Sequence, residues 1–233
     1  MRIAFVFAMP MEAQPLVKRL SLRKETIGGV EVRAGTLGDH DVVAIVTGMG
    51  TKLAGQAASR LLDAVPVDRV VVVGITGAIS DDTPIGTLIV PEVVANAATG
   101  AEFRPDPILD AAPKGTMWTT DELLTSPDVL AGLRERGVIS LDMETAAVAE
   151  VCERRGIPWS VVRVISDKAH DGSVDTEVFK LSNQDGSPNP KAVAKYLVRH
   201  PQRIPALARL GKQANLARTK AVDVAVDAVT RLP

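Results

Sequence analysis

The chain alternates between short β-branched apolar runs and Ala- or Leu-rich segments whose apolar positions recur with helical spacing. The runs at 68–75 (DRVVVVGI) and 159–166 (WSVVRVIS) are nearly continuous, which is typical of central strands covered on both faces. Further strands are predicted at 2–8, 30–36, 41–47 and 86–96, the last of them bent or bulged at Pro91. Helices are predicted at 11–20, 51–64, 126–136 and 143–155, and over most of 174–232.

This order of elements predicts an α/β fold in three layers, α/β/α, around a mixed, mostly parallel central sheet. The sequence contains no linker, internal repeat or low-complexity tract. We therefore expect residues 1–233 to form a single domain.

Composition narrows the choice of partners and cofactors. Of the 233 residues, 46% are hydrophobic and 24% charged, as is usual for a globular protein with a sizeable core. A net charge of −1 gives no reason to expect nucleic acid or an anionic membrane as partner. The single cysteine, Cys152, fits a reducing cytoplasm and lies on an apolar helix face, where we expect an inert core residue. The N-terminal apolar run is too short for a signal peptide or a membrane span. The three histidines show no metal-ligand spacing, so we expect neither a metal nor a cofactor.

Candidate chemistry follows the strands, because ligands of such sheets bind at the carboxyl ends of the strands. Two carboxylates stand out there, Glu12 after the first strand and Asp167 after the last. The other residues at these ends that could form a pocket are Met9, Gly48, Met49, Gly50, Ile75, Thr76, Gly77 and Ser166.

Each of these features also has a purely structural interpretation. Asp167 could cap the next segment, and Asp142 could be an ordinary helix N-cap. Glu12 in a first helical turn is favoured by the helix dipole whatever its function. The glycines of "TGMG" could serve a tight turn only, since Leu53 breaks a G-x-G-x-x-G phosphate fingerprint and no P-loop motif is present.

Five motifs in order resemble a known family: "AMPMEA", "TGMG", "GITGA", "LDMETAAVA" and "VVRVISDKA". Together they span about residues 1–170 and resemble the nucleoside phosphorylase/nucleosidase superfamily, closest to the methylthioadenosine/S-adenosylhomocysteine nucleosidases. The resemblance implies hydrolysis of the bond between ribose and a purine, with a small-molecule nucleoside as partner. It also implies a cytoplasmic homodimer that needs no cofactor.

The resemblance assigns roles to individual residues. Asp167 matches the acid that protonates adenine N7, with Ser166 holding its orientation, and its pKa is expected to be raised by desolvation. Glu12 matches the base that deprotonates the attacking water. Glu144 matches the acceptor of the ribose diol, and Met143 the side chain packed against the sugar. The remaining predicted substrate-binding residues are Asp142, Met49, Ile75, Thr76, Gly77, Leu123 and Leu124.

The sequence also departs from the family pattern. Ala78 replaces the usual second glycine of "GITGA", and the segment 97–115 is shorter than the excursion that usually helps to cover the substrate. The tail at 181–210 resembles the hopanoid-associated branch, which is thought to remove adenine from adenosylhopane. Such a substrate would need a wide apolar exit for its 5′ group, so an adenosylhopane or futalosine-type nucleosidase is the alternative to the methylthioadenosine type.

Other functions stay open as well. A phosphorylase needs cationic or N–H partners for phosphate beside the anomeric carbon, and "AMPMEA" and "TGMG" contain no arginine, so water is the expected nucleophile. A nucleoside-binding protein without activity would have little need of Glu12 as a base. A Rossmann-type redox enzyme is disfavoured by the missing dinucleotide fingerprint.

Overall fold

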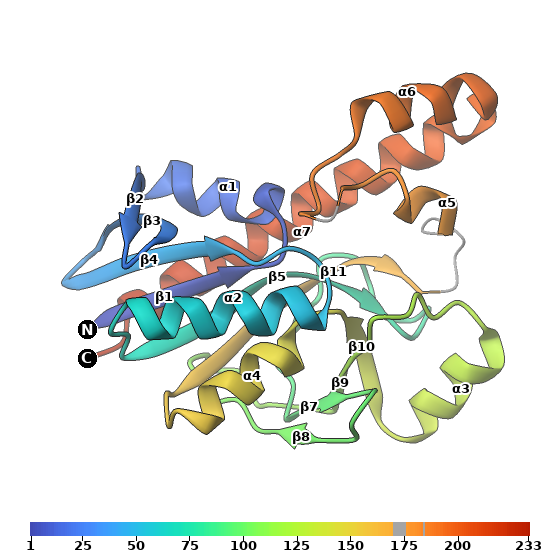
Figure 1. The fold of residues 1–233 in the computed structure, drawn as a ribbon. Coiled ribbons are helices and arrows are strands. Elements are labelled where there is room, and N and C mark those ends of the chain that lie inside the picture. Colours follow the sequence, from blue (N-terminus) through green and yellow to red (C-terminus); the bar gives the residue numbers. More distant parts are fainter. Residues whose placement is uncertain (170–175, 184) are drawn as a thin grey trace.

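The computed structural model describes residues 1–169, 176–183 and 185–233 (Figure 1). The strands are β1 (Arg2–Phe7), β2 (Arg23–Ile27), β3 (Val30–Leu37), β4 (His40–Val46), β5 (Arg69–Ala78), β6 (Leu88–Ile89), β7 (Val93–Asn96), β8 (Glu102–Phe103), β9 (Thr116–Thr119), β10 (Val138–Asp142) and β11 (Trp159–Lys168). The helices are α1 (Pro10–Arg19), α2 (Thr51–Ala64), α3 (Pro127–Glu135), α4 (Thr145–Arg154), α5 (Thr176–Phe179), α6 (Pro190–Arg199) and α7 (Ile204–Thr230), with a 3₁₀ turn at Pro201–Arg203.

All the strands belong to one mixed sheet in the order β2-β3-β4-β1-β5-β10-β9-β7-β8, with β11 and β6 branching from β5. The centre is parallel, since β1 runs parallel to β4 and β5, and β5 runs parallel to β11. The antiparallel pairs include the β2–β3 and β7–β8 hairpins at the two ends of the sheet. Strand β5 therefore lies at the branch point, with its carboxyl end next to both β11 and β10.

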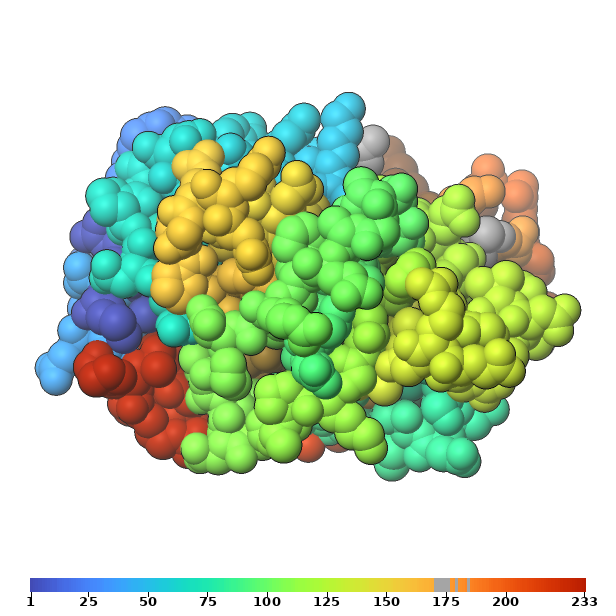
Figure 2. Space-filling model, turned by 90° about the horizontal axis from the view of Figure 1, so that it is seen from below, coloured from blue at the N-terminus to red at the C-terminus, as the bar shows by residue number. Residues whose placement is uncertain are grey.

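Helices cover both faces of this sheet, as the alternation of side chains in β1 illustrates. Ile3, Phe5 and Phe7 pack with α1 and α7 on one face, whereas Ala4 and Val6 pack with α2 and α4 on the other. In the view from below, the surface of α4 (yellow-orange) lies next to that of β7 and β8 (green) (Figure 2). The predicted three-layer fold is confirmed.

Several details of the element prediction need correction. The expected single strand at 86–96 is two short strands separated at Pro91, because β6 pairs with β11 whereas β7 pairs with β9. Strands β2, β8, β9 and β10 were not predicted, since their short or polar stretches carry little apolar periodicity. The expected helical tail at 174–232 begins at residues 174–175, which lie outside the described residues.

Three further observations concern the cysteine, membrane spans and metal binding. Cys152 is fully buried in α4, and this burial raises the pKa of its thiol to about 12, which makes it an unreactive core residue. Among the residues described, no helix combines the length and the apolar character needed to cross a bilayer. No cluster of three or more His, Cys, Asp or Glu side chains in the same part of the chain could hold a metal ion.

Candidate active site

A cavity of about 300 Å³ lies at the carboxyl ends of β1, β5, β10 and β11. Every residue to which the family resemblance assigned a site role lines this cavity, whereas Gly48 and Gly50, named for their position after a strand, do not. Those with an assigned role are Glu12, Met49, Ile75, Thr76, Gly77, Leu123, Leu124, Asp142, Met143, Glu144, Ser166 and Asp167. The structure thus brings together positions from six separate stretches of the chain.

Glu12 is held at the start of α1, directly after β1. Its Oε2 accepts hydrogen bonds from the backbone N–H groups of Ala8 (3.0 Å) and Met9 (2.9 Å), and its Oε1 accepts one from Ile75 (2.8 Å). Only 1% of Glu12 is exposed, so these three donors replace water around the carboxylate. The carboxylate therefore joins the ends of β1 and β5 at one fixed point.

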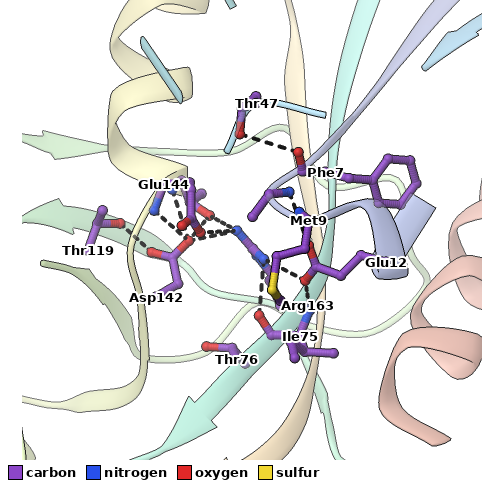
Figure 3. Close-up of polar contacts among 12 residues, drawn as sticks. Phe7, Met9, Glu12, Thr47, Ile75, Thr76, Thr119, Asp142, Glu144 and Arg163 are labelled. Carbon is purple, nitrogen blue, oxygen red and sulfur yellow. Dashed lines mark hydrogen bonds and ion pairs between the residues drawn. The ribbon is translucent and has the colours of Figure 1, made fainter. Parts of the chain in front are cut away.

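Arg163 is the residue that organises the site, and it was not predicted as part of it. It lies in the middle of β11, 1% exposed, and its guanidinium points towards three carboxylates (Figure 3). Its Nη2 is 2.8 Å from Asp142 Oδ2 and 3.4 Å from Glu144 Oε2, and its Nη1 is 3.7 Å from Glu12 Oε1. Nη1 also donates to the carbonyl oxygen of Ile75 at 3.0 Å.

A sequence signal for Arg163 did exist. It is the one charged residue within the apolar run "WSVVRVI", and a buried charge must be paired. The signal was overlooked because every other residue of the run fits an ordinary central strand.

Asp142 is engaged mainly in holding other groups in place. Its Oδ1 accepts from Thr119 Oγ1 (2.6 Å), and its Oδ2 accepts from the N–H (2.9 Å) and the hydroxyl of Thr145, the first residue of α4. The same Oδ2 binds Arg163 Nη2. Asp142 lines the cavity, but these bonds occupy both oxygens, so the residue fixes Arg163 and the start of α4 and has little capacity left for a ligand.

Glu144 occupies the N-cap position of α4 and reaches across to the start of α2. Its Oε1 accepts from the backbone N–H of Gly50 (3.1 Å), and its Oε2 lies near Arg163. The positive φ of Gly50 (96°) turns that N–H towards the cavity, a conformation that glycine adopts readily. This bond uses one glycine of "TGMG", where the sequence allowed either a ligand contact or a simple turn.

Two of the carboxylates around the guanidinium, Glu144 and Glu12, have raised pKa values, and burial is the main cause in both. Burial, reinforced by the charge of Asp142, raises the pKa of Glu144 to about 8, although Arg163 and the Gly50 N–H act against it. Burial also raises the pKa of Glu12 above its ordinary value, against the lowering effects of Arg163 and the backbone donors. Burial lowers the pKa of Arg163, but the surrounding carboxylates outweigh it, so its pKa is raised and the guanidinium stays charged.

Asp167 is aimed into the cavity by a bulge in β11. Ile165 pairs with Thr76 and Asp167 with Gly77, so Ser166 is an extra residue that has no partner on β5. The hydroxyl of Ser166 donates to Asp167 Oδ1 at 2.5 Å. A Cβ at Gly77 would lie 3.4 Å from Asp167 Oδ2, so the carboxylate rests directly over this glycine. The Ser166 hydroxyl and Gly77 thus fix the position of the Asp167 carboxylate.

Part of the cavity lining, which we name the apolar end, combines residues of the motif "AMPMEA" with residues of α5 and α7, two helices that the sequence did not point to. The apolar end consists of Met9, Met11, Val178, Leu210 and Ala214. Helix α7 is tied to α1 at this place, because Arg218 Nη1 donates to the carbonyl oxygen of Met11. None of the residues 97–115 lines the cavity, which is compatible with the expectation that this short segment leaves room for a 5′ group.

Comparisons with known proteins found similar sequences and similar folds. The 5′-methylthioadenosine/S-adenosylhomocysteine nucleosidase of Shewanella piezotolerans is 28% identical over 204 residues, which cover 74% of this chain and 89% of that protein. The solved structure of the S. pneumoniae enzyme of the same name, with a transition-state inhibitor, has a TM-score of 0.75 at 19% identity and full coverage of both chains. Futalosine hydrolase of Helicobacter pylori also has a TM-score of 0.75, at 16% identity, over 99% of this chain and 98% of that one.

The two solved structures share less than 25% sequence identity with this chain, so their similarity shows the fold alone. Membership of a family rests on a separate match. The family model described as the phosphorylase superfamily matches residues 2–113 and 109–199, which is most of the chain. The protein therefore belongs to the phosphorylase superfamily.

Proposed function

We propose that the protein is a purine nucleosidase that hydrolyses the N-glycosidic bond of a 5′-substituted adenosine and releases adenine. The names of its relatives support this substrate class. The convergence of Glu12, Glu144 and Asp167 on one cavity supports the reaction. In this reaction the oxygen of water attacks the anomeric carbon, the bond to the purine nitrogen breaks, and its electron pair leaves with the base.

Glu12 would act as the general base for the attacking water. A buried carboxylate with a raised pKa is a stronger base than one in water, which suits it to take the proton that water loses on attack. Three backbone N–H groups already hold Glu12, so it needs no reorganisation as the charge develops. Arg163 holds the carboxylate in register and stabilises its ionised form.

Asp167 would protonate the purine that leaves. A proton delivered to the purine ring turns a poor leaving group into a neutral one, and Asp167 would supply it at N7 with Ser166 fixing the carboxyl group. Glu12 binds the N–H of Ile75 and Asp167 lies over Gly77. The two carboxylates are thus held over positions two residues apart on β5, and a nucleoside between them would meet one on the water side and the other on the purine side, the arrangement of roles that inverting glycosidases use.

Glu144 and Met143 would hold the ribose. A carboxyl group whose pKa lies near 8 can accept a hydrogen bond, or donate one when protonated, so it can pair with a ribose hydroxyl in either form. Met143 lines the same part of the cavity and would pack on the sugar ring. Leu123 and Leu124 would flank the adenine.

The observation that carries hydrolysis over phosphorolysis is the charge balance around Arg163. Among the described residues that line the cavity, Arg163 is the only one with a guanidinium, and it faces three carboxylates within 3.7 Å. It therefore has no positive charge to spare for phosphate. A phosphate dianion next to this cluster would be repelled, whereas neutral water would not.

The test is to incubate the protein with 5′-methylthioadenosine with and without inorganic phosphate and to follow free adenine and the sugar product. We expect equal rates of adenine release and a free reducing sugar in both reactions. Adenine release that requires phosphate and yields a sugar 1-phosphate would contradict the proposal. Binding without release of any base would support the non-catalytic alternative.

The apolar end of the cavity favours a second candidate substrate, a nucleoside with a large apolar 5′ group such as adenosylhopane. Met9, Met11, Val178, Leu210 and Ala214 offer such a group apolar contact and few hydrogen bonds. The futalosine-type alternative has only the likeness of fold to support it.

We also infer a homodimer in the cytoplasm, without a cofactor and with the chain folded as a single domain. The resemblance to the nucleosidases supports the dimer, and the single buried cysteine is compatible with a reducing compartment. Light scattering on the purified protein would test the dimer directly, since a monomeric mass at micromolar concentration would contradict it.

A further inference from the structure

Helix α6, the turn Pro201–Arg203 and the first half of α7 form a helical hairpin, residues 190–216, which we name the basic arm. It projects beyond the sheet at the end of the molecule opposite the β2–β3 hairpin (Figure 1). The arm contains six basic residues and no acidic one: Lys191, Lys195, Arg199, Arg203, Arg209 and Lys212. The remainder of the chain has 21 basic and 28 acidic residues, so the net charge of −1 conceals a strong asymmetry.

The charges of α6 are arranged as a stripe on its solvent side. Lys191, Lys195 and Arg199 are spaced four residues apart, which puts them on one face of the helix, and all three are exposed. None of the three forms an ion pair with any described residue. Arg209 and Lys212 are exposed in the same way on α7.

Apolar side chains are exposed among these charges. Val198 is 83% exposed, three residues from Lys195 and next to Arg199, and Ile204 at the start of α7 is 48% exposed. The opposite side of α6 is packed, since Tyr196 is buried and its hydroxyl accepts a hydrogen bond from Arg203 at 3.3 Å. The arm is thus fixed to itself on one side and presents cations mixed with apolar groups on the other.

We propose that the basic arm docks on an anionic phospholipid bilayer. Basic helices with exposed apolar residues lie in the membrane interface, where the cations contact phosphate headgroups and the apolar groups enter the acyl boundary. The acidic remainder of the molecule would orient the protein with this arm towards the negative surface. The site does not depend on the reaction proposed above, because it is separate from every carboxylate of the cavity.

Nucleic acid fits this surface less well. Single strands bind through aromatic rings on which bases stack, and Tyr196, the only Phe, Tyr or Trp of the arm, is buried. The exposure of Val198 serves no purpose against a phosphate backbone, whereas at a membrane it adds apolar contact.

The arm also contributes to the cavity wall. Leu210 and Ala214 belong to the arm and line the apolar end of the cavity. A protein held by this arm would therefore present its apolar cavity end near the bilayer.

Sedimentation of the full-length protein with vesicles tests the proposal. We expect binding to phosphatidylcholine vesicles that contain phosphatidylglycerol, no binding to pure phosphatidylcholine, and weakening by salt. Removal of three cations in the variant Lys191→Gln/Lys195→Gln/Arg199→Gln should weaken binding roughly 100-fold, and Val198→Ser should weaken it further. The matched control, Arg23→Gln/Lys24→Gln/Arg33→Gln, removes the same charge from the exposed β2–β3 hairpin and should bind vesicles like the unmodified protein.

Both triple variants should retain helix content and nucleosidase turnover of a small nucleoside, since neither changes a cavity residue. Failure to bind the anionic vesicles, or equal weakening by both triple variants, would overturn the proposal. Tighter binding to duplex DNA than to vesicles at physiological salt, lost in the α6 variant, would identify the arm as a nucleic-acid surface and would overturn it as well.

Discussion

At the scale of single residues, Arg163 determines how three carboxylates can share one small buried space. Each carboxylate alone would lose its hydration on burial, and the guanidinium compensates for that loss. Gly74 makes the approach possible, because a Cβ there would lie 2.3 Å from Glu12 Oε1 and 2.6 Å from Arg163 Nη1. The cluster thus depends on a charge in β11 and an absent side chain in β5.

Removing the guanidinium should therefore be costly. Arg163→Met keeps much of the apolar volume but leaves three carboxylates without a cation, and we expect it to lower the free energy of unfolding by about 3–5 kcal/mol. Denaturant unfolding at neutral pH measures the change. Arg155→Met is the control, because Arg155 pairs with the exposed Asp63 and should lose about 1 kcal/mol or less. Similar losses for both variants would contradict the central role of Arg163.

The raised pKa of Glu144 predicts a pH dependence of stability. Its pKa near 8 lies above the ordinary value of 4.5, so between these values the folded protein holds a proton that the unfolded chain releases. Stability is therefore highest at low pH within this window and is lost as the pH rises through about 8, by at most about 1.4 kcal/mol per pH unit.

Replacing the carboxyl isolates this contribution. Glu144→Gln should flatten the fall in unfolding free energy between pH 5 and 8, as measured by chemical denaturation at a series of pH values. Part of the slope should remain, because the pKa of Glu12 is raised as well. An unchanged slope in the variant would assign the proton to another group.

Asp167 separates an enzyme from a binding protein. Asp167→Asn can still accept the hydrogen bond of Ser166 but has no carboxylic proton to deliver, so turnover should fall ~10²-fold or more while nucleoside binding persists. Turnover and melting temperature are measured on one preparation. Asp121→Asn, at an exposed carboxylate that binds Thr51, is the control and should keep full turnover. A stable and fully active Asp167→Asn would remove Asp167 as the acid.

At the scale of elements, strand β5 forms the floor of the cavity, because it contacts both Glu12 and Asp167. Its N–H at Ile75 binds Glu12, its Gly77 lies under Asp167, and Thr76 Oγ1 donates to the carbonyl oxygen of Leu141 at 2.7 Å. The bulge at Ser166 then sets the direction of the acid relative to this floor. The strand is therefore a common reference for residues that enter from β1, β10 and β11.

The floor can be tested through Gly74. Gly74→Ala should displace Glu12 and Arg163, and we expect turnover to fall ~10²-fold or more because the base loses its position. Gly132→Ala in α3 is the matched control: nothing lies within 4 Å of its Cβ position, and alanine is favoured over glycine in a helix by about 1 kcal/mol. Full activity of Gly74→Ala would show that the cluster tolerates the methyl group.

At the scale of the whole molecule, the sequence predicted the three layers and named residues that share one cavity, but not the contacts that hold them. Long apolar runs such as 68–75 decide a central strand whatever their neighbours, so β5 was predictable. Strands β9 and β10 form only because tertiary pairing favours them over their weak local pattern. The contacts of Arg163 join residues up to 151 positions apart in the chain, which no local pattern encodes.

The sequence predicted that the short segment 97–115 could leave room for a large 5′ group, and no residue of that segment lines the cavity. The residues of α5 and α7 that form part of the apolar end were not predicted. Helix α7 follows all the strands in the chain and contacts α1 through the hydrogen bond from Arg218 to Met11, 207 positions away. Its position next to the cavity therefore depends on the tertiary fold and not on a local pattern. The roles of the individual site residues stay predictions until variants are measured.

The last prediction concerns the 5′ group, which the whole-molecule arrangement places against α7 if the proposed reaction is right. Ala214 is 8% exposed and lines the apolar end, so Ala214→Leu should fill space that a long 5′ group needs. For 5′-alkylthioadenosines, kcat/KM should fall roughly 10–200-fold for long chains and little for methylthioadenosine, since the methyl group reaches less far. Ala208→Leu adds the same atoms on the exposed side of α7 and should change neither substrate. Equal losses for short and long chains would indicate a general disturbance of the site, and no loss for either would place the 5′ group away from α7.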